Sequence, residues 1–338
     1  MIGRHTLGGL IVDPIDGARP GRLTIEDEVI AEVAEDPSGP RAPLLFPGFI
    51  DLQVYEPAAI ASSGVTGYLQ TAQEPVDTTD PLCLGLHLEG PFLNPEASGA
   101  IPVDRICDVD LNLLGEWLAR GDVRIVTVAP EIEGGLDAVR CVAESGAVAA
   151  VGHTHASATV ARAAADAGAR FVTHAWNAMA PVRARRTGPL PELLLDERIT
   201  IGLIADGRHL HPAIEELTLR VAGPERIALT SDLVAAPVLP DNRLAGGDRA
   251  GAGLVAQMAS WGLAEAAMMA SLVPARVLGL TDRGRLAPGF RADLAVLDER
   301  LKPLETVVAG KTFWDVRYPQ TQELDEIPPS THAPGSGA

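Results

Sequence analysis

Residues 147–176 read AVAAVGHTHASATVARAAADAGARFVTHAW and contain the smallest unit of the predicted fold. Two short apolar runs, 147–154 and 171–176, flank the stretch ATVARAAADAG, in which apolar residues recur at helical spacing. Runs that are apolar at nearly every position are typical of strands buried on both faces, as in parallel sheets. A helix between two such strands predicts a βαβ unit with parallel strands.

The same pattern extends over the middle of the chain. Eight short apolar runs occur there, namely FPGFIDLQV (46–54), TGYLQTA (66–72), CLGLHLEG (83–90), RIVTVAPE (124–131), AVAAVGHT (147–154), FVTHAW (171–176), TIGLIADG (200–207) and RIALTSD (226–232). Helically spaced segments lie between the later runs, so we expect an α/β fold, a closed (β/α)₈ barrel of the TIM type. The links at 55–65 and 73–82 are barely long enough for parallel crossovers, so the barrel is expected to be partly trimmed there.

Polar side chains gather at the carboxyl ends of these runs, namely Gln53, Glu89, Glu131, His153, His174, Asp206 and Asp232. A polar residue at the end of a single strand is usually only solvated. In a (β/α)₈ barrel, however, the carboxyl ends of the strands surround the catalytic face. Carboxylates, imidazoles and an amide at seven of the eight strand ends therefore predict a catalytic centre.

Three of these residues carry the donor groups of a hydrolytic metal site, which needs about three protein ligands and one open position. Glu89, His153 and His174 offer one carboxylate and two imidazoles from the third, fifth and sixth strands. A single buried histidine is more often a core residue than a ligand, but two at the ends of successive strands favour a metal. Asp232, at the end of the eighth strand, is a candidate general base.

The two ends of the chain have a different pattern. Residues 1–46 and 285–316 contain short alternating strands with Gly and Pro turns. We expect them to pair as one small β-sandwich domain beside a barrel formed by residues 47–284. The remaining residues, 317–338, are rich in Pro, Ser and Gly and are predicted to be a disordered tail.

Composition argues against several classes of partner. The 338 residues include 45 acidic and 27 basic side chains, which gives a formal net charge of −18. Such a surface repels phosphate backbones and anionic lipid, so we expect neither nucleic acid nor membrane as a partner. Cys83, Cys107 and Cys141 lack disulfide or metal-site spacing, and the start of the sequence lacks a signal-peptide pattern. Both features predict a cytoplasmic protein.

Seven motifs occur in order along the chain, namely PGFID-Q (47–53), GLHLEGPFLNP (85–95), VAPE (128–131), VGHTHA (151–156), THAWNAM (173–179), IADGRH (204–209) and LTSD (229–232). Together they resemble the N-acetylglucosamine-6-phosphate deacetylases of the amidohydrolase superfamily. The resemblance continues through PARVLGL (274–280) and RLAPGFRADLAVL (285–297). It implies a small-molecule substrate, an amino-sugar phosphate, whose N-acetyl amide is hydrolysed with release of acetate.

The resemblance also implies roles for individual residues. Glu89, His153 and His174 would bind a divalent metal ion, which we expect to be zinc, and Asp232 would act first as general base and then as general acid. The substrate-binding residues would be Asn177, Ala178 through its backbone, Arg185, His209 and Gln53. Gln53 stands where many amidohydrolases have the second histidine of a His-x-His pair, so one metal ion is expected. A homodimer is implied as well.

Three features depart from the family pattern. Ile101 occupies the position of a histidine that helps to polarise the substrate carbonyl, and an isoleucine cannot donate a hydrogen bond. The two links at 55–65 and 73–82 are short, and so is the segment 233–247 after Asp232. Two alternatives therefore remain open: an amidohydrolase that cleaves a different amide, or a catalytically impaired homologue that only binds a sugar phosphate.

Overall fold

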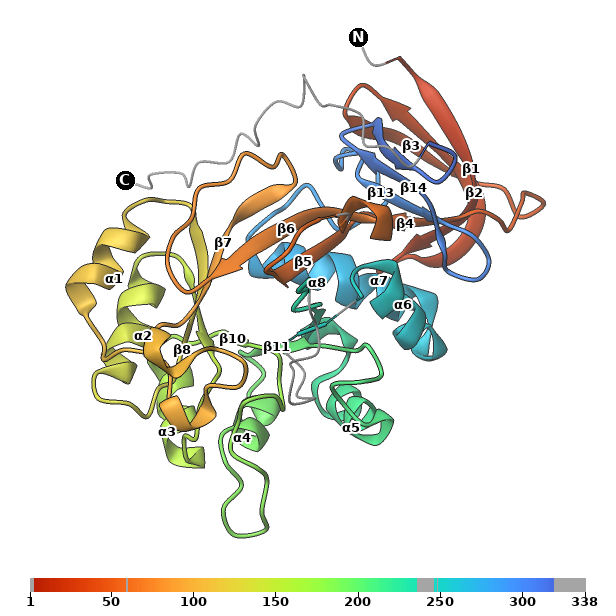
Figure 1. Ribbon diagram of the computed structural model, residues 1–338. Coiled ribbons are helices and arrows are strands. Elements are labelled where there is room, and N and C mark those ends of the chain that lie inside the picture. Colours follow the sequence, from red (N-terminus) through yellow and green to blue (C-terminus); the bar gives the residue numbers. More distant parts are fainter. Residues whose placement is uncertain (1–2, 59, 236–245, 248, 319–338) are drawn as a thin grey trace.

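The protein is built on two sheets, which lie side by side in Figure 1. The computed structural model describes residues 3–58, 60–235, 246–247 and 249–318. Most of the short segment after Asp232 and of the predicted C-terminal tail lies outside these residues. Within them, no helix combines the length and the apolar character that crossing a membrane would require.

All eight predicted barrel strands are present. They follow one another in sequence order, and every neighbouring pair is parallel. The strands are β5 (Phe49–Val54), β6 (Val65–Ala72), β7 (Cys83–Glu89), β8 (Val123–Val128), β9 (Val148–Val151), β10 (Phe171–Val172), β11 (Thr200–Leu203) and β12 (Ile227–Leu229). Their residues are almost all buried, as the continuous apolar runs predict.

The sheet closes where its last strand returns to its first. Beyond β12, Leu233 forms a parallel bridge with Val54, and its carbonyl oxygen accepts hydrogen bonds from the backbone N–H groups of Tyr55 at 2.9 Å and Glu56 at 3.0 Å. We call this junction the closing seam. It confirms the (β/α)₈ barrel, and it brings the carboxyl ends of the first and eighth strands together.

Helices cover the later strands, whereas the first two crossovers lack them. The helices are α1 (Leu111–Leu118), α2 (Gly135–Glu144), α3 (Ala158–Asp166), α4 (Leu190–Leu195), α5 (Pro212–Ala222), α6 (Ala252–Met258), α7 (Leu263–Ala267) and α8 (Val273–Val277). Between β5 and β6 the described residues form only the 3₁₀ turn Ile60–Ser63, and residues 73–82, all described, form no helix. This is the trimmed side that the short links predict.

The second sheet contains strands from both ends of the chain and lies against the trimmed side (Figure 1). Its order is β15-β14-β13-β4-β1-β2-β3. The strands are β1 (His5–Asp13), β2 (Gly17–Glu26), β3 (Val29–Glu35), β4 (Leu44–Pro47), β13 (Leu294–Leu297), β14 (Pro303–Val308) and β15 (Lys311–Asp315). Thr306 on β14 donates a hydrogen bond to the carbonyl oxygen of Ala61 at 2.6 Å, so the sheet takes a position that barrel helices would otherwise fill.

A buried carboxylate ties this sheet to the barrel. Asp293 is 5% exposed; its side chain accepts a hydrogen bond from Arg283 at 2.8 Å and another from the backbone N–H of Ala309 at 2.8 Å. Its carbonyl oxygen accepts from the N–H of Gly48, at the entry to the first barrel strand, at 2.8 Å. Arg291 also donates to this carboxylate at 3.0 Å, but Arg283 is only 6% exposed and relies on Asp293 for compensation of its charge.

We predict that Asp293→Asn lowers the free energy of unfolding by about 3–5 kcal/mol, because Arg283 would remain buried without its counter-charge. Denaturant unfolding measures the change. Asp137→Asn is the matched control, since Asp137 pairs with Arg140 on the surface and such pairs contribute about 0–1 kcal/mol. Equal, small losses in both variants would contradict the prediction.

Candidate active site

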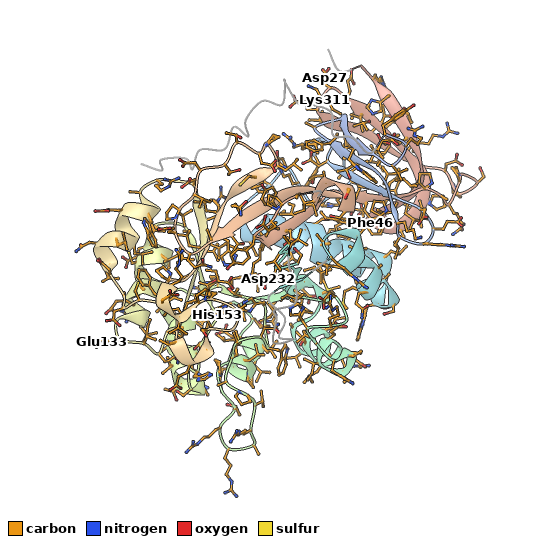
Figure 2. All side chains as sticks on the ribbon, in the orientation of Figure 1. Asp27, Phe46, Glu133, His153, Asp232 and Lys311 are labelled. Carbon is orange, nitrogen blue, oxygen red and sulfur yellow. The ribbon has the colours of Figure 1, made fainter. Side chains whose placement is uncertain are left out.

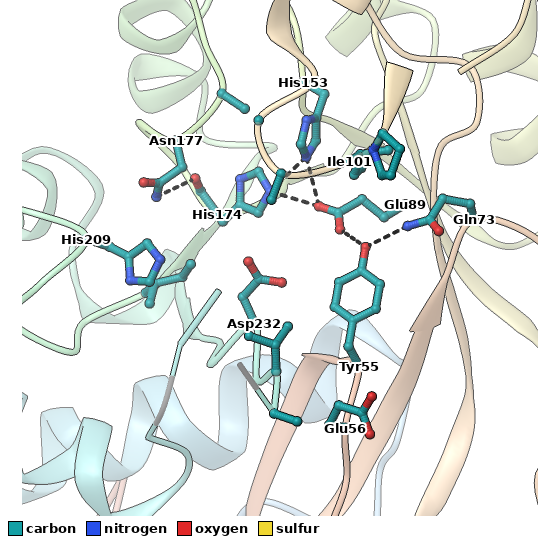
Figure 3. Close-up of a pocket in the computed structure, with 17 residues that line it drawn as sticks. Tyr55, Glu56, Gln73, Glu89, Ile101, His153, His174, Asn177, His209 and Asp232 are labelled. Atoms are coloured by element: carbon teal, nitrogen blue, oxygen red, sulfur yellow. Dashed lines mark hydrogen bonds and ion pairs between the residues drawn. The ribbon is translucent and has the colours of Figure 1, made fainter. Parts of the chain in front are cut away.

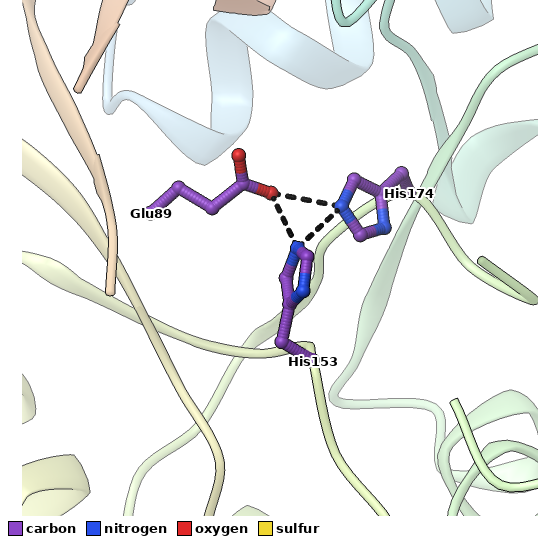
Figure 4. Close-up of side chains that lie close together, drawn as sticks. All are labelled: Glu89, His153 and His174. Carbon is purple, nitrogen blue, oxygen red and sulfur yellow. Dashed lines mark hydrogen bonds and ion pairs between the residues drawn. The ribbon is translucent and has the colours of Figure 1, made fainter. Parts of the chain in front are cut away.

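Three side chains converge at the carboxyl rim of the barrel (Figure 4). Glu89 ends β7, while His153 and His174 each stand two residues beyond a strand. The Nε2 atoms of the histidines lie 3.1 Å apart, and they lie 3.1 and 2.8 Å from Oε1 of Glu89. Each of the three residues is at most 4% exposed, so their polar atoms have little water to interact with.

The backbone at this rim adopts a conformation that non-glycine residues rarely take. Five of the described residues with positive φ lie here, namely His153 at 47°, His174 at 28°, Trp176 at 76°, Ala178 at 50° and Asp232 at 49°. Left-handed backbone costs free energy for residues with a Cβ atom and clusters at functional sites. Four of the five, all except Trp176, line one cavity at the rim.

The cluster of Glu89, His153 and His174 fits a metal ion. Tetrahedral zinc with bonds of about 2.0–2.1 Å holds its ligand atoms about 3.3 Å apart, close to the distances between these three atoms. Nδ1 of His153 donates to the carbonyl oxygen of Ala97 at 2.9 Å, which leaves Nε2 as the ring nitrogen that faces the cluster. Burial alone would raise the pKa of Glu89, but hydrogen bonds from both histidines lower it well below its usual value.

Asp232 faces the same cavity from the end of β12. Burial, together with the charges of Glu89 and Asp51, raises the pKa of Asp232 well above its usual value. A carboxylate with a raised pKa holds a proton more readily, which suits a group that accepts and then returns one. Its Oδ1 accepts a hydrogen bond from Nε2 of Gln53 at 3.0 Å.

Gln53 links the two carboxylates. Its Nε2 donates to Oε1 of Glu89 at 2.9 Å as well as to Asp232, and its side chain is 1% exposed. The residue therefore lies behind the carboxylates and does not line the cavity. An amide N–H has no lone pair to offer a metal, so Gln53 serves here as a donor to both acids.

The cavity in front of these groups has a volume of about 640 Å³ and opens to solvent, which is within the usual range for small-molecule sites (Figure 3). His153 and Asp232, which both line the cavity, are labelled near the centre of the molecule in Figure 2. Asn177 and His209 line one side of the cavity, and Tyr55, Gln73 and Ile101 line the other. An apolar Ile101 thus faces the site, at the position where the resemblance implies a histidine.

Of the five substrate-binding residues expected from the resemblance, three line the cavity and two, Gln53 and Arg185, do not. Asn177, Ala178 and His209 line the cavity, and Nδ1 of His209 lies 2.9 Å from Asp206, which leaves Nε2 for a ligand. Arg185 does not line it. This arginine is exposed in the loop between β10 and α4, which turns at the bridge between Arg183 and Arg186 and projects away from the barrel in Figure 1.

Three polar residues of the cavity lining were not anticipated from the sequence. Tyr55, Glu56 and Gln73 come from the links after the first and second strands. The hydroxyl of Tyr55 donates to Oε2 of Glu89. One signal was available, because Tyr55 and Glu56 directly follow the first strand and so belong to the same rim.

Glu131 and His87 support the site from outside the cluster. Oε1 of Glu131 accepts from Asn94 at 2.8 Å, and Oε2 accepts from the hydroxyl of Thr154 at 2.5 Å, so the residue joins the loops after β7 and β9. Burial lowers the pKa of His87 to about 4, so this imidazole is neutral. It donates to the carbonyl oxygen of Leu52 at 2.8 Å inside the barrel.

Comparisons with known proteins identify the family. The Amidohydrolase family matches residues 133–313. N-acetylglucosamine-6-phosphate deacetylase of Bos taurus is 31% identical over 91% of this chain and 90% of its own, and that of Lysinibacillus sphaericus is 32% identical over 68% and 66%. The Mycobacterium smegmatis deacetylase, solved with N-acetyl-D-glucosamine-6-phosphate, is 30% identical, with a TM-score of 0.83 over 92% of this chain and 99% of its own.

The barrel fold, the family match and the cluster of Glu89, His153 and His174 together identify the chain as a metal-dependent amidohydrolase. Such an enzyme is a hydrolase that acts on amide C–N bonds. Within that class, the chain belongs to the N-acetylglucosamine-6-phosphate deacetylase family.

We predict that one divalent ion per chain is retained after dialysis, because Gln53 places N–H donors where a second ion would need lone pairs. Elemental analysis of the purified protein measures the ratio. Glu89→Gln should lose the ion, whereas Glu216→Gln, which alters a surface pair with Arg220, should retain it. Two equivalents in the unaltered protein would contradict a single site.

Proposed function

We propose that the chain hydrolyses the N-acetyl amide of N-acetylglucosamine-6-phosphate to glucosamine-6-phosphate and acetate. The observation that carries the proposal is the position of the metal-binding cluster and Asp232 around one cavity. The family relationship supports the choice of substrate, since relatives named for this deacetylation cover up to 91% of the chain. Free thiols at Cys83, Cys107 and Cys141 support a reducing, cytoplasmic location.

The metal in this proposal is zinc, held by Glu89, His153 and His174. Two imidazoles and one carboxylate, with a fourth position left open, are typical of catalytic zinc sites. Such an ion polarises the amide carbonyl and lowers the pKa of water when it is bound.

Asp232 carries the proton in this reaction. Its carboxylate accepts a proton from the attacking water as the water oxygen bonds to the carbonyl carbon. It then donates that proton to the sugar nitrogen as the C–N bond breaks, which leaves acetate and a free amine. Gln53 holds Oδ1 of Asp232 by a hydrogen bond, so Oδ2 is the oxygen available for both transfers.

The phosphate of the substrate needs positive charge inside a strongly acidic protein. His209 lines the cavity, with Nδ1 at 2.9 Å from Asp206 and Nε2 left to contact the phosphate. Arg185 lies outside the cavity of its own chain, so its expected role requires a second copy. We therefore include a homodimer in the proposal, in which the projecting loop of one subunit approaches the cavity of the other.

Replacing Asp232 by Asn should lower kcat by about 10²–10⁴, because the amide keeps the shape of the side chain but cannot accept the proton. Acetate release from N-acetylglucosamine-6-phosphate measures turnover, and elemental analysis checks that the metal stays bound. Asp166→Asn, on the outer surface of α3, should behave like the unaltered protein. Unchanged turnover in Asp232→Asn would exclude the proposed proton transfer.

Replacing Arg185 by Ala should raise KM for the phosphorylated sugar by about tenfold or more, as expected from loss of a charged contact. It should have little effect with unphosphorylated N-acetylglucosamine. Steady-state kinetics on both sugars give the comparison, and the shift should be absent wherever the protein is monomeric by light scattering. A similar change in KM for the two sugars would identify the loop as solvated surface.

A further inference from the structure

We infer that Tyr55 and Gln73 are positioning residues that hold the carboxylate of Glu89 in the orientation that binds the metal. Neither residue belongs to the cluster of metal ligands, and both line the cavity beside it (Figure 3). The inference rests on the proposed metal site and is independent of which amide the enzyme cleaves.

The direction of the hydrogen bonds follows from the chemistry of the groups. Nε2 of Gln73 can only donate, and it lies 3.1 Å from the hydroxyl oxygen of Tyr55. That hydroxyl in turn donates to Oε2 of Glu89, which as a carboxylate oxygen can only accept. The chain of donors therefore runs from Gln73 through Tyr55 to Glu89 and satisfies the hydroxyl as both acceptor and donor.

The two oxygens of Glu89 consequently have different partners. Oε1 faces the Nε2 atoms of His153 and His174, and Oε2 faces Tyr55 on the opposite side. The last torsion of a glutamate side chain has no sharp intrinsic preference, so the carboxylate plane must be fixed by contacts. Tyr55 supplies the contact that keeps Oε1, and not both oxygens, directed at the ion.

Tyr55 is itself held firmly enough to do this. Its N–H donates to the carbonyl oxygen of Leu233 at 2.9 Å across the closing seam, and its own carbonyl oxygen accepts from Nε2 of Gln70 at 2.9 Å. The tyrosine is thus fixed at its backbone by two contacts and at its hydroxyl by two more. A side chain anchored in this way can restrain its neighbour, as groups that orient metal ligands do.

The test is zinc affinity, measured by titrating dialysed protein with Zn²⁺ against a chromophoric chelator. Tyr55→Phe keeps the ring and removes only the hydroxyl, and we expect it to weaken zinc binding by about 10–100-fold. Gln73→Met should weaken it less than Tyr55→Phe does, because the hydroxyl of Tyr55 remains.

Tyr68→Phe is the matched control. It removes a tyrosine hydroxyl that also bonds a carboxylate, Asp80 at 2.9 Å, but that lies outside the cavity lining. This variant should bind zinc as the unaltered protein does. Thermal unfolding of the zinc-free proteins should give similar Tm values for Tyr55→Phe and Tyr68→Phe. A difference in zinc affinity between the two variants then reflects metal positioning and not a general loss of packing.

Activity at saturating zinc gives a second readout. If Tyr55 acts through Glu89, excess zinc should restore most of the turnover of Tyr55→Phe. Zinc affinity of Tyr55→Phe equal to that of the unaltered protein would overturn this inference but not the proposed metal site. A loss of turnover in Tyr55→Phe that excess zinc does not relieve would also overturn the inference, since it would indicate direct contact of Tyr55 with the substrate. Absence of zinc binding in the unaltered protein would overturn the proposed metal site as well.

Discussion

The carboxylate of Glu89 is the interaction on which the rest of the site depends. It is 2% exposed, and a buried charge is stable only where donors or a cation compensate it. Gln53, His153 and His174 all face its Oε1, at 2.8 to 3.1 Å, and each comes from a different strand end. The barrel must therefore hold four strand ends in register around one oxygen atom, and small displacements of any strand would separate the groups.

Closure of the barrel provides that register. The closing seam joins the first and eighth strands, and the N–H of Ser231 reinforces it by donating to the buried carboxylate of Asp51 at 3.1 Å. Burial raises the pKa of Asp51 to about 6. Asp232 lies between Ser231 and Leu233, so the same contacts that close the sheet bring the acid–base group opposite the cluster of Glu89, His153 and His174.

The trimmed side of the barrel forms one wall of the cavity beside the cluster of Glu89, His153 and His174. The described residues of the first two crossovers form no α-helix, and the terminal sheet covers the first strands, where Thr306 links it to the 3₁₀ turn at Ala61. The shortened links bring Tyr55 and Gln73 to the cavity, where they contact each other and Glu89. Loops on a rigid barrel can vary in this way because strand positions, and not loop lengths, set the metal-binding geometry.

The sequence by itself determined the eight barrel strands, the sheet from both chain ends and the polar rim, because burial on both faces and strand-end position are local properties of the chain. The family motifs also indicated Glu89, His153, His174 and Asp232 before their proximity was known. Only the tertiary structure decided that Gln53 lies behind the acids, that Arg185 projects away from its own cavity and that Tyr55 contacts Glu89. Those outcomes depend on side-chain direction and loop path, which are set by contacts between segments far apart in sequence.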